Sequence, residues 1–483
     1  MSRKPRFFSV FSIFSILAIL TGPLPHASAS CNSILRGYPA RFDAYTTDTD
    51  AGLERLRNAE TGLIQDKIEI VADVGNPTVR VLNANTSPTN VALDLIRLAS
   101  ATDGASAKRL AQVLHSLARM ERHPDSGLFY SWYATDASLA VKSRDVSSVD
   151  NIHLALALWT IAATHSGQEG KLARSLLKTM DFSDFYDSKT GLMGGNLKYQ
   201  NGEWNLEAYR FDQFGSEARS IYAVVYALKL LKKTPDSSFL KKSVEALNAE
   251  VFLWKDGTTV RPILRTWDGG AFQLLLPKLL LNEEKYSPEL ARIFENYARY
   301  TRVRAREAKL PVPAAYSACN YGVEGSGSFH GPDYWGKAGS PELVSLGHQD
   351  VKNASDRALW DEVFTPHAAF LAATADPKAF GPWLKHAESL RSGKNTLYVR
   401  GFGFMDGYHV RGADQGRVVP VQLSLDQGMI ALALQQIEDS HGYGFSGKAL
   451  SRDPEASARL KRFYQAIDRK LKRVINASET NPR

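Results

Sequence analysis

Stretches with the apolar spacing of α-helices recur along almost the whole chain. Residues 107–120 place leucine and valine three and four positions apart, and residues 149–163 are apolar almost all round, which is typical of a helix buried on every side. The same periodicity predicts further helices at 51–64, 89–98, 169–179, 216–232, 237–248, 270–281, 287–308, 366–373, 378–391, 427–438 and 454–474. Short hairpins are expected at 68–71 with 79–81, around 192–210, and at 397–404. The sequence therefore predicts about twelve helices and little sheet.

The segments between these helices are long. The stretches 122–148, 181–215, 310–364 and 401–426 are rich in glycine, tyrosine, tryptophan and aspartate, and loops of that length inside a folded protein usually carry function. This pattern favours an all-α fold, an (α/α)6 toroid in which an outer ring of helices surrounds an inner ring. A solenoid of helical repeats is the alternative, but the sequence has no fixed repeat of about 30 to 45 residues.

The first 30 residues have the pattern of a secretory signal peptide. A basic start is followed by the apolar run Phe7–Leu20 and by the small residues 27–29, and the run is too short to span a bilayer. Cys31 follows directly, so a lipid anchor is the second possibility, although Ser28 stands where a lipoprotein signal has a large aliphatic residue. We expect a periplasmic or secreted protein whose residues 31–483 form one toroid domain, with 454–474 as an outer helix.

Charge and cysteine content limit the kinds of function that the protein could have. The formal net charge is +8, and three of the cations belong to residues 1–30, which lack acidic residues, so the mature chain carries +5. No run of basic and aromatic residues suggests nucleic-acid binding. Cys31 and Cys319 are the only cysteines; Cys319 is expected to be a buried small residue, and a disulfide with Cys31 is the alternative. Neither a metal site nor a cofactor is predicted.

Carboxylates and aromatic rings gather in the long loops. Sugars present apolar C–H faces that flat aromatic rings match, and glycosidases use a pair of carboxyl groups. The first-rank carboxylates are Asp150, Glu217, Glu324, Asp406 and Asp426, and the second rank is Glu207, Asp212, Asp268, Asp333 and Asp350. Capping of a helix N-terminus is the alternative for Asp150 and Asp426, because both precede apolar helical runs.

Nine short motifs, taken in order, resemble a known family. They are residues 86–93, 127–133, 147–151, 185–187, 215–219, 267–272, 276–277, 403–406 and 425–428. Together they are similar to the glucoamylase-like domain shared by endo-β-1,2-glucanases and the cyclising domain of cyclic β-1,2-glucan synthases. The resemblance covers roughly residues 85–440, which is most of the chain.

The resemblance implies roles for individual residues. Glu217, in Ser-Glu-Ala-Arg, matches a catalytic carboxylate, and Glu324 matches the acid/base, although its motif is one residue shorter than in the family. Asp150 and Asp426 complete the set of catalytic candidates. The candidates for substrate binding are Tyr130, Trp132, Asn151, Trp267, Asp268, Tyr321, Trp335, Asp406 and Gln427. The chain departs from the family at Gln273, where relatives often have glutamate.

These observations predict a glycoside hydrolase that acts on an oligo- or polysaccharide, a β-linked glucan and most specifically β-1,2-glucan. Two alternatives remain open. A transglycosylase would pass the glycosyl unit to another sugar hydroxyl, and a non-catalytic protein would bind glycan within an exopolysaccharide pathway.

Overall fold

The computed structural model describes residues 39–71, 77–233, 236–320, 334–335, 339–347, 363–377, 383–412, 414–438 and 445–480. The predicted signal peptide, Cys31, Tyr321 and Glu324 lie outside these residues. The α-helices are α2 (Pro39–Arg55), α3 (Pro88–Ser100), α4 (Gly104–Arg119), α5 (Ser148–Thr164), α6 (Gln168–Thr179), α7 (Arg219–Leu228), α8 (Asp236–Ala246), α9 (Ala271–Leu281), α10 (Pro288–Glu307), α12 (Pro366–Ala375), α13 (Trp383–His386), α14 (Ser424–Glu438), α15 (Phe445–Arg452) and α16 (Pro454–Thr480).

Six of the helices form a closed inner ring. Neighbours pack in the order α3, α5, α7, α9, α12, α14 and back to α3. These helices are the most apolar in the chain, and α5 and α9 are buried on nearly every side. Buried side chains from all six belong to one continuous core. The ring explains why residues 149–163 lack a polar face.

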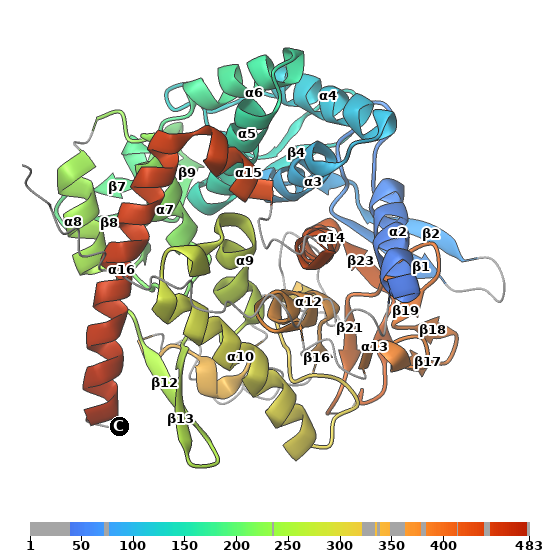
Figure 1. The fold of residues 1–483 in the computed structure, drawn as a ribbon. Helices are drawn as coiled ribbons and strands as arrows, with labels where there is room; N and C mark the ends of the chain where they lie inside the picture. The colour runs from blue at the N-terminus through green and yellow to red at the C-terminus, as the bar shows by residue number, and fades with distance from the viewer. Residues whose placement is uncertain are drawn as a thin grey trace, which may run out of the picture.

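An outer layer of amphipathic helices surrounds this ring (Figure 1). Helix α4 packs on α3, α6 on α5, α16 on α7, α10 on α12 and α2 on α14. Each has one apolar face toward the ring, as in α16, whose buried positions follow helical spacing from Ala456 to Ile475. The arrangement confirms the predicted toroid of two concentric helix layers.

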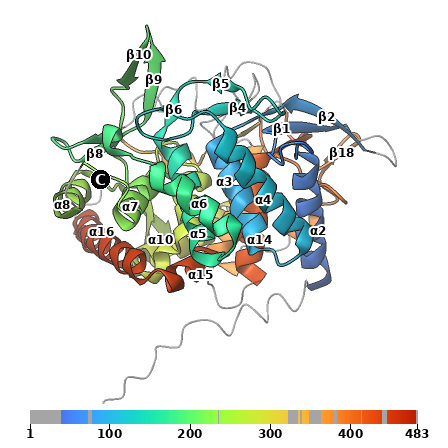
Figure 2. The ribbon, with the colours of Figure 1, turned by 90° about the horizontal axis from the view of Figure 1, so that it is seen from above.

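The prediction of an all-α protein is wrong in one respect, because the chain also forms many small antiparallel sheets. Its three-stranded sheets have the strand orders β2-β1-β23, β10-β9-β6, β11-β8-β7, β16-β21-β22 and β3-β4-β5. The remaining sheets are the two-stranded pairs β12-β13, β14-β15, β17-β18 and β19-β20. Figure 2 shows these strands gathered mainly at one end of the helical ring. Their shortness explains why sequence periodicity did not reveal most of them.

The strands have the following bounds: β1 Lys67–Val71, β2 Thr78–Asn83, β3 Asn85–Thr86, β4 Trp132–Ala134, β5 Val141–Ser143, β6 Val146–Ser147, β7 Tyr186–Asp187, β8 Leu192–Gly194, β9 Asn196–Gln200, β10 Glu203–Leu206, β11 Arg210–Phe211, β12 Val251–Asp256, β13 Thr259–Leu264, β14 Cys319–Asn320, β15 Tyr334–Trp335, β16 Val363–Phe364, β17 Arg391–Ser392, β18 Asn395–Thr396, β19 Tyr398–Val399, β20 Gly403–Phe404, β21 Gly407–His409, β22 Val418–Val419 and β23 Val421–Leu423. The predicted hairpins at 68–81, 192–210 and 397–404 are confirmed as β1–β2, β9–β10 and β19–β20.

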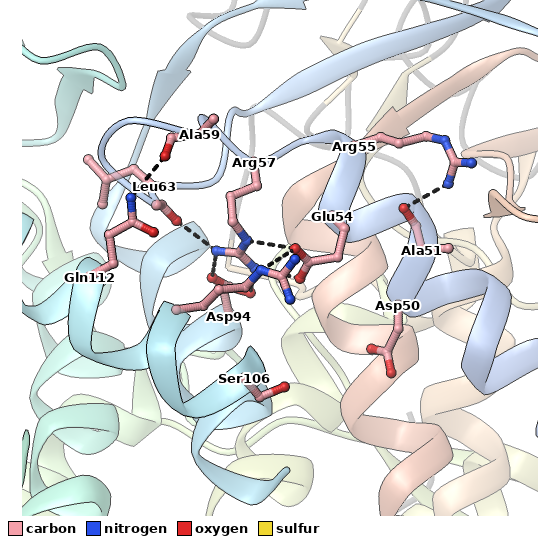
Figure 3. Close-up of polar contacts among 12 residues, drawn as sticks. Asp50, Ala51, Glu54, Arg55, Arg57, Ala59, Leu63, Asp94, Ser106 and Gln112 are labelled. Atoms are coloured by element: carbon pink, nitrogen blue, oxygen red, sulfur yellow. Dashed lines mark hydrogen bonds and ion pairs between the residues drawn. The ribbon is translucent and has the colours of Figure 1, made fainter. Parts of the chain in front are cut away.

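A buried ion network joins the outer helix α2 to the inner helix α3 (Figure 3). The Asp94 carboxylate lies 2.7 Å from Arg57 and 2.9 Å from Arg97, and Glu54 of α2 lies 3.1 Å from Arg57 and 2.9 Å from Arg97. The two arginines outweigh burial and lower the pKa of Asp94 to about 2. The network therefore holds α2 against the ring through charges that pair with one another.

One further sequence prediction concerns the outer surface. The C-terminal helix predicted at 454–474 is confirmed and extends to Thr480. None of the helices in the described part of the chain is long and apolar enough to cross a membrane.

Candidate active site

The N-terminal ends of the inner helices meet at one end of the ring. The Thr89 hydroxyl, in the first turn of α3, donates a hydrogen bond of 2.5 Å to Asp150 in the first turn of α5. His367 of α12 and Asp426 of α14 face each other at 3.3 Å. Glu217 and Asp268, which stand just before α7 and α9, are close enough for the charge of Glu217 to raise the pKa of Asp268. The N-termini of the inner helices, each with partial positive charge, therefore carry two groups of carboxyl side chains at this end of the ring, one with Glu217 and one with Asp426.

Serines cap the first two inner helices and leave neighbouring polar side chains available. Ser87 accepts the Asn90 N–H at 3.2 Å and caps α3. Ser147 accepts the Asp150 N–H at 3.2 Å and caps α5. Asp150 is consequently not the cap, and its carboxylate lies beside Thr89.

Glu217 lies deep in the protein, but its side chain is only partly buried. Burial raises the pKa of this carboxyl group, and the negative charge of Asp150 raises it further, against the Ser216 hydroxyl and the Arg219 charge. Ser216 donates to the Glu217 carboxylate at 3.0 Å. A glutamic acid that stays protonated and reachable is suited to general acid catalysis.

The loop that carries Glu217 lies directly against the loop that carries Asp268. At Gly215 a Cβ atom would stand 1.8 Å from the carbonyl oxygen of Arg265, so only glycine permits this approach. Asp268 is 1% exposed, and its carboxyl group accepts the Gly270 N–H at 2.7 Å. Burial, with a contribution from the charge of Glu217, raises the pKa of Asp268 to about 8.

Arg219 fixes the start of α7 to α9 from within the core. Its guanidinium is fully buried and pairs with the equally buried Glu283 at 2.6 Å. It also donates to the carbonyl of Gln273 at 2.9 Å. Because Pro277 follows Gln273 by four residues and has no N–H, that carbonyl lacks its usual helical donor. Arg219 replaces the missing donor and explains why the Ser-Glu-Ala-Arg and Leu-Pro motifs occur together.

A second acidic group lies at the start of α14. Asp406 and Asp426 are 1% and 2% exposed. Burial raises the pKa of Asp426 well above its usual range, and the neighbouring Asp406 raises it further. Two adjacent buried carboxyl groups cannot both ionise readily, so they are expected to share a proton. Burial lowers the pKa of His367 to about 3, which leaves its ring neutral beside Asp426.

Several buried polar atoms surround this acidic pair without a protein hydrogen-bond partner. They include Oε1 of Gln422, Oε1 of Gln427 and Nε2 of His367. Buried polar atoms are normally satisfied, and water commonly supplies the missing partner. The region around Asp426 is therefore suited to holding water close to a carboxyl group.

The predicted sugar-binding residues occupy different positions. Tyr130 is 1% exposed beneath Trp204, and Trp132 is 8% exposed in β4. Asn151 is fully buried, where its amide accepts the Phe129 N–H at 2.7 Å and donates to the Phe129 carbonyl at 2.8 Å. These side chains support the loop 127–133.

The other binding candidates lie closer to the second acidic group or beside Asp268. Gln427 is fully buried and donates to the Phe404 carbonyl at 2.8 Å. Trp267 is half-buried and packs against Val344. The backbone of Trp335 pairs with that of Cys319. Tyr321 and Glu324 belong to the part of the chain that the structure does not describe.

Gln273, the position at which relatives often have glutamate, contacts the Asp268 loop. Its side-chain oxygen accepts the Asp268 N–H at 3.3 Å. An amide can do this without placing a negative charge beside Asp268 and Glu217. Glutamine at this position is thus compatible with a neutral Asp268.

His367 and Tyr209 are neighbours of the acids that the sequence did not single out. His367 stands in the alanine-rich helix α12, where a lone histidine resembles an ordinary core residue. Tyr209 is 43% exposed, and the charge of Glu217 raises its pKa together with burial. No sequence spacing connects either residue to its carboxylate. Within the described ranges, no group of three or more His, Cys, Asp or Glu side chains can hold a metal ion.

Comparison with known proteins identifies the fold. No protein-family model and no curated protein sequence matches the chain. An endo-β-1,2-glucanase from Talaromyces funiculosus, in complex with sophorose, matches 92% of each chain with a TM-score of 0.70 and 15% identity. The complex of a mutant of that enzyme with β-1,2-glucan gives 0.69 and 14% over 92% of each chain.

The chain has the endo-β-1,2-glucanase fold. The enzyme from Chitinophaga pinensis, in complex with sophorotriose and glucose, gives a TM-score of 0.64 at 15% identity over 90% of this chain and 98% of that one. The resemblance read from the sequence motifs is confirmed at the level of the fold. The endo-β-1,2-glucanase fold also confirms the toroid, here with small sheets added to its helices.

Proposed function

We propose that this protein is an exported glycoside hydrolase that cleaves a β-linked glucan, specifically β-1,2-glucan. One observation carries the proposal. Glu217 has a raised pKa and a reachable side chain at the end of the ring where the inner helices begin. The shared fold supports the choice of glucan, because the enzymes from Talaromyces funiculosus and Chitinophaga pinensis are endo-β-1,2-glucanases.

Glu217 is the proposed general acid. A protonated carboxyl group in this position donates its proton to the glycosidic oxygen as the bond to the anomeric carbon breaks. Burial, and to a smaller extent the negative charge of Asp150, raises the pKa of Glu217 and so favours its protonated form. The Thr89 hydroxyl donates a hydrogen bond to Asp150 and fixes its position beside Glu217. Asp150 thus acts by helping to raise the pKa of Glu217.

The Asp406–Asp426 pair is the proposed base. In the ring order, α14 is three places from α7, so Asp426 begins the helix opposite the one that Glu217 precedes. Attack on the anomeric carbon comes from the side opposite the leaving oxygen, and an opposite carboxylate meets that requirement. A pair that shares one proton retains one negative charge with which to activate water, and the neutral ring of His367 lies 3.3 Å from Asp426.

The substrate class is tested by incubating the mature protein with linear and cyclic glucans of several linkages and sizing the products by chromatography. The proposal predicts shorter products from β-1,2-glucan and little change in the other glucans. Longer or cyclised products would identify a transglycosylase. Binding of glucan without any change in size would identify a non-catalytic glycan-binding protein and contradict the proposal.

Export is proposed from the N-terminal residues 1–30. Expression of the full chain followed by cell fractionation and N-terminal sequencing tests it. Recovery of an uncleaved chain in the cytoplasm would contradict export without affecting the proposed chemistry.

A further inference from the structure

The hairpin β9–β10 carries aromatic surface that the proposed mechanism does not use. Tyr199 of β9 is 45% exposed, although tyrosine rings are usually covered. Trp204 of β10 pairs directly with it across the hairpin, and their ring centroids are 4.8 Å apart. Figure 2 shows this hairpin extending outward from the end of the ring at which the small sheets gather. We call Tyr199 and Trp204 the hairpin platform.

Buried rings hold the hairpin platform in place from behind. Trp204 stacks on Tyr130 with a centroid distance of 5.8 Å and an angle of 9° between the ring planes. The edge of His123 contacts Trp204 at 4.5 Å. Tyr133, fully buried, accepts the Tyr130 N–H at 2.7 Å and so fixes the chain beneath the stack. Tyr130, predicted to bind sugar, is thereby the support of a more exposed surface.

Polar contacts secure the base of the hairpin. Lys198 of β9 contacts Asp145 at 2.5 Å, and Asn196 donates to Glu207 at 2.7 Å. A surface fixed in this way loses little conformational entropy when a ligand binds to it. Rigid exposed rings are typical of a binding surface.

The hairpin platform is connected to the acidic end of the ring. Strand β9 pairs with β6, where Asn196 is opposite Ser147, the residue that caps the helix carrying Asp150. Tyr199 lies three residues farther along β9, which is about 10 Å at the usual rise of a strand. Exposed Tyr209 lies at the base, against Phe211 and close to Glu217. A few sugar units would span this distance.

We propose that the hairpin platform binds the glucan chain beyond the bond that is cleaved, so that longer glucans are held more tightly than short ones. The inference rests on the proposed function, because it assigns the polymer to the same substrate. Aromatic faces match the C–H faces of pyranose rings. Because every unit of the polymer has such a face, the rings can bind it at any position along its length. Tyr209 continues this surface toward Glu217.

The test compares substrates of two lengths on three variants. Tyr199→Ala removes the exposed ring, Tyr199→Phe keeps the ring without its hydroxyl, and Val260→Ala truncates a similarly exposed side chain, 46% exposed, on the separate hairpin β12–β13. Removal of an aromatic anchor typically costs about a factor of ten in affinity. We expect Tyr199→Ala to raise KM for long β-1,2-glucan about tenfold, with kcat unchanged and with no effect on a short oligosaccharide. Tyr199→Phe and Val260→Ala should behave like the wild type.

A binding measurement separates this inference from the proposed function. The electrophoretic mobilities of Glu217→Gln and of the double variant Glu217→Gln/Tyr199→Ala are compared in gels that contain long β-1,2-glucan. Binding to the glucan retards the protein. Retardation that Tyr199→Ala abolishes supports the hairpin platform even if the wild type cleaves no glucan. Equal retardation of both proteins, or an equal loss of activity on short and long glucans, would overturn it. Capture of a protein partner through Tyr199 without retardation by glucan would likewise overturn it.

Discussion

Replacing the buried pair Arg219–Glu283 with apolar residues tests which contacts fix the start of α7. Glu283→Leu would leave the Arg219 guanidinium buried without its carboxylate, at a cost of about 3–5 kcal/mol in the free energy of unfolding. Arg219→Met would leave the Glu283 carboxylate unpaired, at a similar cost, and would also remove the donor to the Gln273 carbonyl, at about 1–3 kcal/mol more. The double variant leaves neither of these buried charges and should lose only the hydrogen bonds that Arg219 donates to the carbonyls of Ser216, Gln273 and Leu274.

The measurement is urea unfolding followed by far-UV circular dichroism, with the four proteins in one double-mutant cycle. The account predicts strong non-additivity, because the double variant should be more stable than Arg219→Met alone. Adding Pro277→Ala to Arg219→Met should restore about 1 kcal/mol, since alanine returns the N–H that the Gln273 carbonyl lacks. Pro277→Ala in the wild type is the control. Additive losses, or no recovery from Pro277→Ala, would refute the proposed roles of Arg219 and Pro277.

Three further predictions concern other contacts. Asp94→Ala should destabilise the protein by about 3–5 kcal/mol, since Arg57 and Arg97 would remain buried without it. The same substitution at Asp103, an exposed helix cap, should cost much less. Equal losses in urea unfolding would contradict the network. In the folded protein the pKa of Asp268, about 8, lies above the ordinary aspartate value of 3.8. Its contribution to stability is therefore fully present below about pH 4 and falls by about 1.4 kcal/mol per pH unit as the pH rises to about 8. Asp268→Asn, which keeps an acceptor for Gly270, should flatten that slope in unfolding measured across this window, and an unchanged slope would show that Asp268 is ionised in the folded protein. Gly215→Ala should separate the Glu217 and Asp268 loops, because its Cβ would meet the Arg265 carbonyl; we expect at least a tenfold loss of kcat/KM on glucan, while Gly257→Ala, in an open turn, should change kcat/KM little.

The sequence predicted most helices of the two layers because most of them carry their own periodic signal. Two predictions are wrong: the helix expected at 51–64 is instead α2, Pro39–Arg55, and of the helix expected at 378–391 only α13, Trp383–His386, is helical among the described residues. The inner helix α5 lacks a polar face, and α16 repeats one apolar face over many turns, so local spacing identifies both. The small sheets were largely missed because strands of two or three residues, such as β16 and β22, contain no measurable alternation. Their existence depends on pairing with distant segments.

The candidate site was only partly predictable for the same reason. Glu217 was predicted from its motif, and Asp150 from its loop setting and the motif at 147–151. Arg219 and Glu283 are 64 positions apart, and His367 meets Asp426 only after the ring has closed. Tyr130 is a residue type that commonly binds sugars, but tertiary packing places it beneath Trp204.

The central claim is that Glu217 is the general acid of a β-1,2-glucan hydrolase. The most direct measurement is the rate at which wild type, Glu217→Gln and Glu295→Gln shorten β-1,2-glucan. Glu295 is the matched control, because it is also a glutamate of raised pKa but lies on the outer helix α10. The account predicts a rate about 100- to 10,000-fold lower for Glu217→Gln, with an unchanged unfolding midpoint, and a normal rate for Glu295→Gln. A Glu217→Gln protein that shortens the glucan as fast as the wild type would contradict the assignment.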